Sequence, residues 1–116
     1  MMNSKPSKAV EKEWLSRVAE YGCVITRETN VVVHHCIGRE GKSQKYHIGR
    51  IFVLPLAHRF HDNGDFRPNV TMARKEFVAE VGSESSLFRG MCLDLLEDGP
   101  IPITEEEMRA IMATNR

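Results

Sequence analysis

The stretch VVVHHCIG, residues 31–38, ends a run of three β-branched valines with two adjacent histidines. Branching at Cβ favours an extended strand, because such side chains fit a pleated surface. Successive side chains of a strand point to opposite faces, so the imidazoles of His34 and His35 are expected to face in opposite directions. The stretch therefore predicts a strand that delivers one imidazole to each of its two faces.

The composition of the chain is that of a single globular domain. Its 116 residues are 41% hydrophobic and 28% charged, which is ordinary for a domain with one core. No apolar run has membrane-spanning length, and the start, MMNSKPSK, lacks the apolar segment of a secretory signal. Three cysteines without a framework spacing favour a reducing compartment. We therefore expect a cytoplasmic protein with no membrane partner.

Charge is distributed unevenly along the chain, although the formal total is zero. Residues 27–50 carry five basic and two acidic side chains, whereas residues 94–116 carry two basic and six acidic ones. A basic loop beside the histidine pair suits a phosphate backbone. The residues that we expect to contact DNA are Arg39, Lys42, Lys45 and Arg50. The alternative is a solvated loop whose excess of positive charge has no ligand.

Apolar spacing and capping residues predict the other elements. A helix is expected over residues 8–21, with Ser7 as N-cap and Gly22 as its end. The middle of the chain is expected to form short strands at 23–25 and 31–34, an extended loop over 36–50, a buried apolar run at 51–56 and a first helical turn at 57–61. Three further helices are expected after Thr71, after Ser83 or Ser85, and after Thr104, which forms a capping box with Glu107.

These elements predict an α+β fold. We expect a flexible segment at residues 1–7, a domain over residues 8–98, and a linker with a short helix over residues 99–116 that packs on or beside the domain. The helices at the two ends of the chain then flank a middle segment that contains four histidines within reach of one site: His34, His35, His58 and His61. The fifth, His47, lies in the basic loop and is interpreted as solvated.

A strand with two histidines, a loop, an apolar strand and a short helix with histidine is the order of a ββα-metal, or HNH-type, nuclease site. In such a site one imidazole binds a divalent metal, which stabilises charge on the scissile phosphate. The neighbouring imidazole, on the other face, removes a proton from the attacking water. A histidine from the helix completes the protein ligands and leaves positions open for water and phosphate.

Four segments carry a resemblance to a known family: WLSRVAEYGCVIT, VVVHHCIG, FVLPLAHRFH and ARKEFVAEVGSESSLF. Over about residues 14–96 the chain resembles the phage recombination-enhancement (Ref) nucleases, which are RecA-dependent HNH endonucleases of DNA. The resemblance implies that His34 is a metal ligand, His35 the general base and His61 a second ligand. His58, one turn before His61, could reach the same ion. It also implies DNA as a partner and a RecA-type recombinase filament as a candidate partner.

The chain departs from the family at the positions of a structural zinc. Related domains carry Cys-x-x-Cys before the His-His strand and Cys-x-x-His after the "PL", whereas this chain reads CVIT and AHRF. Cys23 remains, and the three other positions are Thr26, Ala57 and Phe60. We therefore expect no structural cysteine-held zinc and a position packed as hydrophobic core. Thr71 stands where the family tends to have another histidine, and Asp62 and Asp65 are nearby carboxylates that could replace it.

The resemblance and the departures from it leave three hypotheses for the function. The first is a metal-dependent DNA endonuclease or nickase, phage-associated, with zinc, magnesium or manganese at one site. The alternative is a catalytically degenerate HNH-like domain that binds DNA or a recombination or repair protein. A third hypothesis is an unrelated regulatory module in which the histidines are structural. Cys36 and Cys92 are expected to be small core residues and not nucleophiles, because no paired base has a sequence signature.

Overall fold

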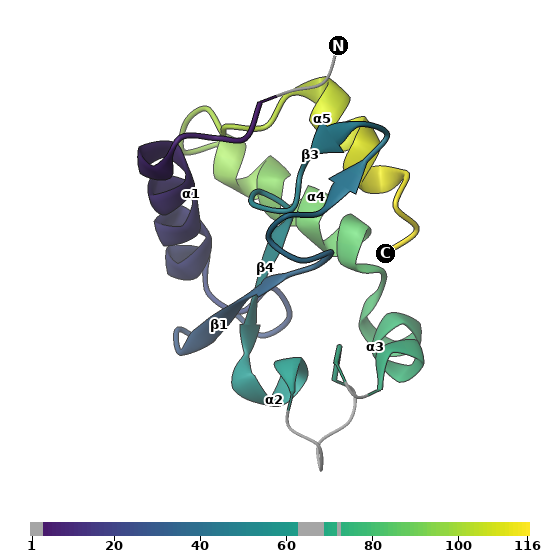
Figure 1. Cartoon of the computed structure of the whole chain (residues 1–116). Helices are drawn as coiled ribbons and strands as arrows, with labels where there is room; N and C mark the ends of the chain where they lie inside the picture. The colour runs from purple at the N-terminus through teal and green to yellow at the C-terminus, as the bar shows by residue number, and fades with distance from the viewer. Residues whose placement is uncertain (1–3, 63–68, 72) are drawn as a thin grey trace.

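Two paired strands form the centre of the fold, in a computed structural model that describes residues 4–62, 69–71 and 73–116 (Figure 1). Strand β1, Val31–His35, runs antiparallel to β4, Val53–Ala57, so that His34 lies opposite Leu54 and His35 opposite Val53. Every residue of β4 is buried, whereas every residue of β1 is partly exposed. β4 therefore runs through the core, whereas β1, which ends with the two histidines, is partly exposed.

Helices surround this pair, and the prediction of an α+β fold is confirmed. In chain order the described elements are α1 (Lys8–Tyr21), β1, β2 (Lys42–Ser43), β3 (Tyr46–His47), β4, α2 (His58–His61), α3 (Arg74–Val81), α4 (Glu84–Leu96) and α5 (Glu105–Met112). Strands β2 and β3 form a separate small antiparallel sheet. No helix in the described part of the chain is both long enough and apolar enough to cross a membrane.

Helix α1 begins and ends at the predicted residues. The Ser7 hydroxyl accepts a hydrogen bond from the Val10 amide, which satisfies one of the free amides of the first turn. Gly22 follows the helix with φ of +86°, a conformation that glycine adopts without steric cost. The buried face presents Trp14 and Val18 to the core, and the Trp14 indole donates to the Ile51 carbonyl at 3.0 Å. α1 is thereby fixed against the strand pair.

Two predictions for the middle of the chain are wrong. Residues 23–25 form no strand, because the chain turns there with Arg27 at φ of +66°, although the Val24 amide donates to the Pro55 carbonyl of β4. The segment 36–50 is not an extended loop, because it contains the β2–β3 hairpin. Its two-residue turn places Gln44 and Lys45 at φ of +50° and +73°. Glutamine and lysine seldom adopt positive φ, so the sequence contains no signal for a two-residue hairpin turn at this position.

Helix α4 packs against β4 and completes the core. Of the two predicted N-cap candidates, Ser83 and Ser85, the cap is Ser83, whose hydroxyl accepts from the Ser86 amide. Its buried face includes Phe88, whose ring lies edge-on to Trp14 and to Phe52 with centroids 6.4 and 5.3 Å apart. The prediction of Thr71 as a cap is wrong, because α3 begins at Arg74 after Ala73 without a side-chain cap.

Helix α5 begins with the predicted capping box, in which Thr104 and Glu107 each accept from the other's backbone amide. Ala110 and Ile111 of this helix are fully buried in the common core. The Ser43 hydroxyl of β2 also donates to the Ala110 carbonyl at 2.8 Å. The C-terminal helix therefore packs on the same core as β4 and α4.

Candidate functional site

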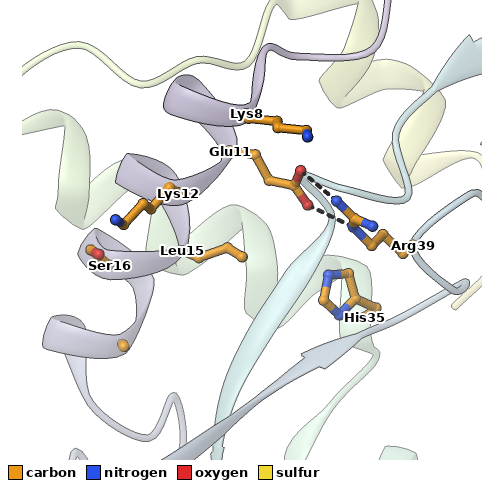
Figure 2. Close-up of a pocket in the computed structure, with 8 residues that line it drawn as sticks. Lys8, Glu11, Lys12, Leu15, Ser16, His35 and Arg39 are labelled. Atoms are coloured by element: carbon orange, nitrogen blue, oxygen red, sulfur yellow. Dashed lines mark hydrogen bonds and ion pairs between the residues drawn. The ribbon is translucent and has the colours of Figure 1, made fainter.

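The two adjacent histidines of β1 face opposite sides, as the alternation of a strand requires. The His34 ring lies against His61 of α2, with ring centroids 5.1 Å apart, and its Nε2 is 3.5 Å from Glu84 Oε1 of α4. His35 lines a cleft formed with α1 (Figure 2). The strand end therefore contributes one imidazole to each of two different surroundings.

On the His34 side, three potential metal ligands converge. One ligand atom from each of His34, Cys36 and Glu84 lies within 4.8 Å of the others. Glu84 is the first residue of α4, and its side chain, which reaches His34 of β1, is only 1% exposed. Within the described ranges, His34 Nε2 and Glu84 Oε2 are buried and accept or donate no hydrogen bond. The Cys36 thiol, in contrast, donates to the His34 carbonyl at 3.9 Å, so two of the group's potential ligand atoms are buried without a hydrogen bond.

Arg116 balances the charge of this group. Its Nε lies 3.8 Å from Glu84 Oε2, which is an ion-pair distance but too long for a hydrogen bond. Its Nη2 donates to the Cys36 carbonyl at 3.0 Å, and the Glu84 amide donates to the Arg116 main-chain oxygen. Residues from β1, α4 and the end of the described chain thus form one interlocked polar cluster.

Cys36 has no features of a nucleophile in this setting. Burial raises the pKa of the Cys36 thiol well above its ordinary value, and the charge of Glu84 raises it further. Burial likewise raises the pKa of Cys92 to about 12. Both side chains are buried members of the hydrophobic core. This placement agrees with the interpretation of the two cysteines as small core residues.

Helix α2 brings His61, but not His58, to the His34 ring. His58 is exposed at the start of the helix, and neither His58 nor His61 belongs to the converging group found among the described residues. Burial lowers the pKa of His61, and a positive charge on His34 would lower it further. His61 Nδ1 is 3.6 Å from the carboxylate of the exposed Asp62. The second carboxylate named from the sequence, Asp65, lies outside the described residues.

Thr71 lies beside His61, although its side chain is exposed. The Thr71 amide donates to the His61 carbonyl at 3.1 Å and also to Asn69 Oδ1. The position at which the resembled family tends to have a histidine is therefore adjacent to α2. A threonine hydroxyl there is a poor replacement for an imidazole ligand.

On the other side of β1, His35 lines an open cleft of about 500 Å³ against α1. Figure 2 shows His35 beside Arg39, with Lys8, Glu11 and Lys12 of α1 across the cleft. Burial lowers the pKa of His35 more than the nearby Glu11 carboxylate raises it. The imidazole is therefore uncharged at neutral pH and able to accept a proton.

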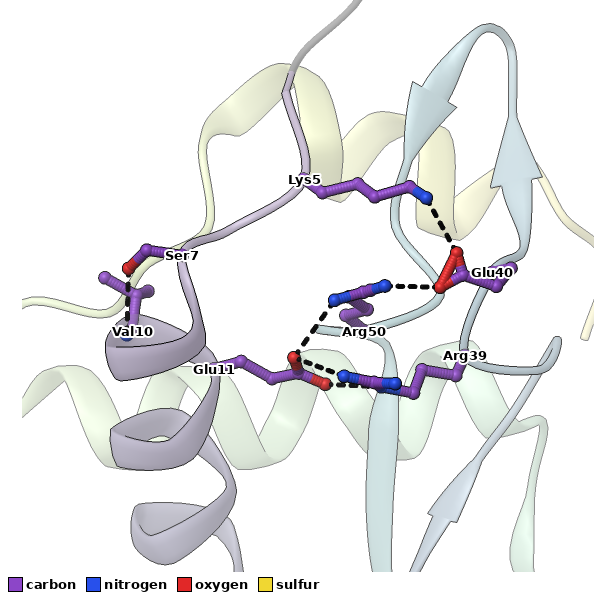
Figure 3. A network of polar contacts seen from close by, with 7 residues as sticks. All are labelled: Lys5, Ser7, Val10, Glu11, Arg39, Glu40 and Arg50. Atoms are coloured by element: carbon purple, nitrogen blue, oxygen red, sulfur yellow. Dashed lines mark hydrogen bonds and ion pairs between the residues drawn. The ribbon is translucent and has the colours of Figure 1, made fainter.

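Two of the four residues that are predicted to contact DNA form ion pairs with carboxylates of the protein itself (Figure 3). Arg39 binds the Glu11 carboxylate with two hydrogen bonds of 2.9 and 3.0 Å, and Arg50 reaches Glu11 at 3.4 Å and also binds Glu40. Lys42 and Lys45 are exposed in the β2–β3 hairpin and form no ion pair with another described residue. The lysines are the more available cations for a phosphate backbone.

Of the positions that hold a structural zinc in the resembled family, Cys23, Thr26 and Ala57 are in contact in this fold. Cys23, Ala57 and Phe60 are buried in the core, whereas Thr26 is exposed. Burial alone would raise the pKa of the Cys23 thiol, but hydrogen bonds from the Ala57 backbone and from Thr26 outweigh it and lower that pKa. The turn at residues 23–26 and the end of β4 are therefore held together by hydrogen bonds to one thiol and by apolar packing.

Comparison with known proteins adds no assignment. No protein-family model matches the chain, and neither a curated protein nor a solved structure matches it.

Sequence reasoning missed Glu84 and Arg116 as parts of the site. A glutamate in the first turn of a helix is common, because its negative charge interacts favourably with the N-terminal end of the helix dipole. The local sequence therefore does not mark Glu84 as a residue that reaches β1.

Proposed function

We propose that the chain is a metal-dependent endonuclease or nickase of DNA, of the HNH type. The observation that carries this proposal is the order and contact of three elements: β1 pairs with β4, α2 follows β4 directly, and the rings of His34 and His61 lie 5.1 Å apart across them. A ββα-metal site has the same order. The His34 Nε2, which is buried and has no hydrogen bond within the described ranges, is suited to a metal ligand.

Each residue has a separate role in this proposal. His34 and His61 would hold a divalent ion, which supplies charge stabilisation at the scissile phosphate when it is bound. His35, neutral and on the opposite face of the strand, takes a proton from the attacking water. Lys42 and Lys45 of the hairpin bind phosphates of the DNA backbone and position the duplex.

One observation favours the alternative function. Thr71 offers only an exposed hydroxyl beside His61, and the His61 ligand atoms lie outside the converging group. A site weakened in this way suits a catalytically degenerate HNH-like domain that binds DNA or a recombination protein, with a RecA-type recombinase filament as the candidate partner. Both functions use the same basic hairpin.

Nicking of supercoiled plasmid separates the two functions. We expect the wild-type protein to nick DNA with magnesium, manganese or zinc, and His34→Ala to lose both nicking and metal binding. The assay is run with and without a recombinase filament, and circular dichroism confirms that the variant is folded. If the wild type fails to nick under all of these conditions but binds DNA, the alternative function is correct.

The lysines of the hairpin provide a test of DNA binding. Replacing Lys42 and Lys45 together by alanine is expected to lower affinity for DNA of any sequence. The dependence of log K on log salt should become shallower by about 2, because each phosphate contact contributes roughly 0.9 to this slope. A matched control replaces two exposed cations elsewhere, Lys75 of α3 and Arg89 of α4, and should change neither quantity. Equal losses in both double variants would show that the hairpin is not the binding surface.

A further inference from the structure

We infer that His34, Cys36 and Glu84 form a binding site for one transition-metal ion of the zinc class, with Glu84 as the carboxylate ligand. The inference rests on the proposed function for the use made of the metal, but the ligand set differs from the one that the resemblance implies. In the set implied by the resemblance, helix α2 and the position of Thr71 supply the ligands beside His34. In the set inferred from the structure, α4, a helix distant in sequence from His34, supplies one ligand.

The distances fit a single ion. His34 Nε2 and Glu84 Oε1 are 3.5 Å apart. Two ligand atoms with bonds of about 2.0–2.1 Å to a tetrahedral zinc ion are roughly 3.3–3.4 Å apart. The Cys36 sulfur lies within 4.8 Å of one ligand atom of each of the other two residues, and its bond to zinc would be longer, about 2.3 Å. The existing backbone can therefore hold the ion.

The burial of the potential ligand atoms gives independent support. Glu84 is 1% and Cys36 2% exposed, and within the described ranges His34 Nε2 and Glu84 Oε2 are buried without a hydrogen bond. Buried polar atoms in folded proteins almost always have a partner. Arg116 does not provide one, since its Nε is 3.8 Å from Glu84 Oε2. A bound cation would satisfy the carboxylate and the imidazole together.

The donor set indicates which metals the site would take. One sulfur, one nitrogen and one carboxylate oxygen suit zinc or cobalt, whereas magnesium binds oxygen ligands and disfavours sulfur. A thiolate and a carboxylate would also neutralise the two charges of the ion. Three protein ligands would leave one position of a tetrahedral ion open, where a water or a phosphate oxygen could bind.

Metal titration of the purified full chain tests this ligand set without any measurement of activity. We expect the wild type to bind one zinc ion by calorimetry, and its cobalt complex to show the near-ultraviolet charge-transfer absorption of a thiolate ligand. Glu84→Gln, which keeps the shape of the side chain, should weaken zinc binding by about 100-fold or more, since even outer partners of metal ligands contribute about 10- to 100-fold. Cys36→Ser should remove the cobalt absorption.

The chain offers matched controls for both variants. Cys23 and Cys92 are also buried free cysteines, so Cys23→Ser and Cys92→Ser should keep the charge-transfer absorption. Thr71→Ala should leave zinc affinity unchanged. Absence of zinc binding, or affinity that is unaffected by both Glu84→Gln and Cys36→Ser, would overturn the ligand set. Metal binding through these residues without any DNA nicking would uphold the site and refute the proposed function. If Glu84→Gln and Cys36→Ser both still nick DNA with magnesium, the proposed function would stand and the site would be refuted.

Discussion

Replacing His35 by alanine is expected to lower the rate of plasmid nicking by roughly 100-fold or more, the usual effect of losing a general base. Metal affinity should remain nearly unchanged, because His35 faces α1 while the converging ligand group lies on the other side of β1. His34→Ala should lose both metal and nicking. The comparison of the two single variants, by calorimetry and on the same plasmid gel, measures whether adjacent imidazoles have different roles.

Chemical rescue distinguishes a proton acceptor from a structural histidine. The cleft beside His35 has a volume of about 500 Å³ and is open, so the alanine variant leaves room for a free imidazole molecule. Added imidazole should therefore restore part of the nicking by His35→Ala and none by His34→Ala. A His35→Ala protein that loses its metal, or that imidazole does not rescue, would contradict the assignment of His35 as the base.

Most helix ends were predictable because their signals are local. Ser7, Gly22 and the pair Thr104 and Glu107 each act within one turn of the backbone that they cap, and the structure places them as predicted, while Ser83 is one of the two caps predicted for α4. The opposite orientation of His34 and His35 is equally local, since it follows from the geometry of any regular strand. These features depend on neighbours within about four residues.

The missed features depend on contacts between segments distant in the sequence. Glu84 lies 50 positions after His34, and only the packing of α4 on β4 brings its carboxylate to β1. The engagement of Arg39 and Arg50 by Glu11 likewise depends on how α1 docks on the loop. A count of charges in the loop therefore overstated the number of cations that are available to DNA. Local patterns carry no record of such pairings.

The buried carboxylate of Glu11 joins α1 to this loop (Figure 3), and its loss is expected to destabilise the whole fold. Its side chain is 7% exposed and binds Arg39 in a bidentate pair, with Arg50 at 3.4 Å. Glu11→Ala would remove the bidentate partner of Arg39 and leave Arg50 with Glu40, and should lower the free energy of unfolding by about 2 kcal/mol. Glu11→Gln, which retains an acceptor, should cost about 1 kcal/mol. Glu13→Gln, on the exposed side of the same helix, is the matched control and should cost little.

The dependence on pH identifies the charge of Glu11 as the cause. Hydrogen bonds from Arg39 lower the pKa of Glu11 below its ordinary value of 4.5, so that between the two values the unfolded chain binds a proton that the folded chain does not. The stability that this carboxylate contributes is therefore complete above about pH 4.5 and is lost as the pH falls through the folded pKa. Tm measured from pH 6 down to pH 3 should thus fall less steeply for Glu11→Gln than for the wild type, and the two curves should converge in acid. Parallel curves for the two proteins would mean that Glu11 acts through packing and not through its ion pairs.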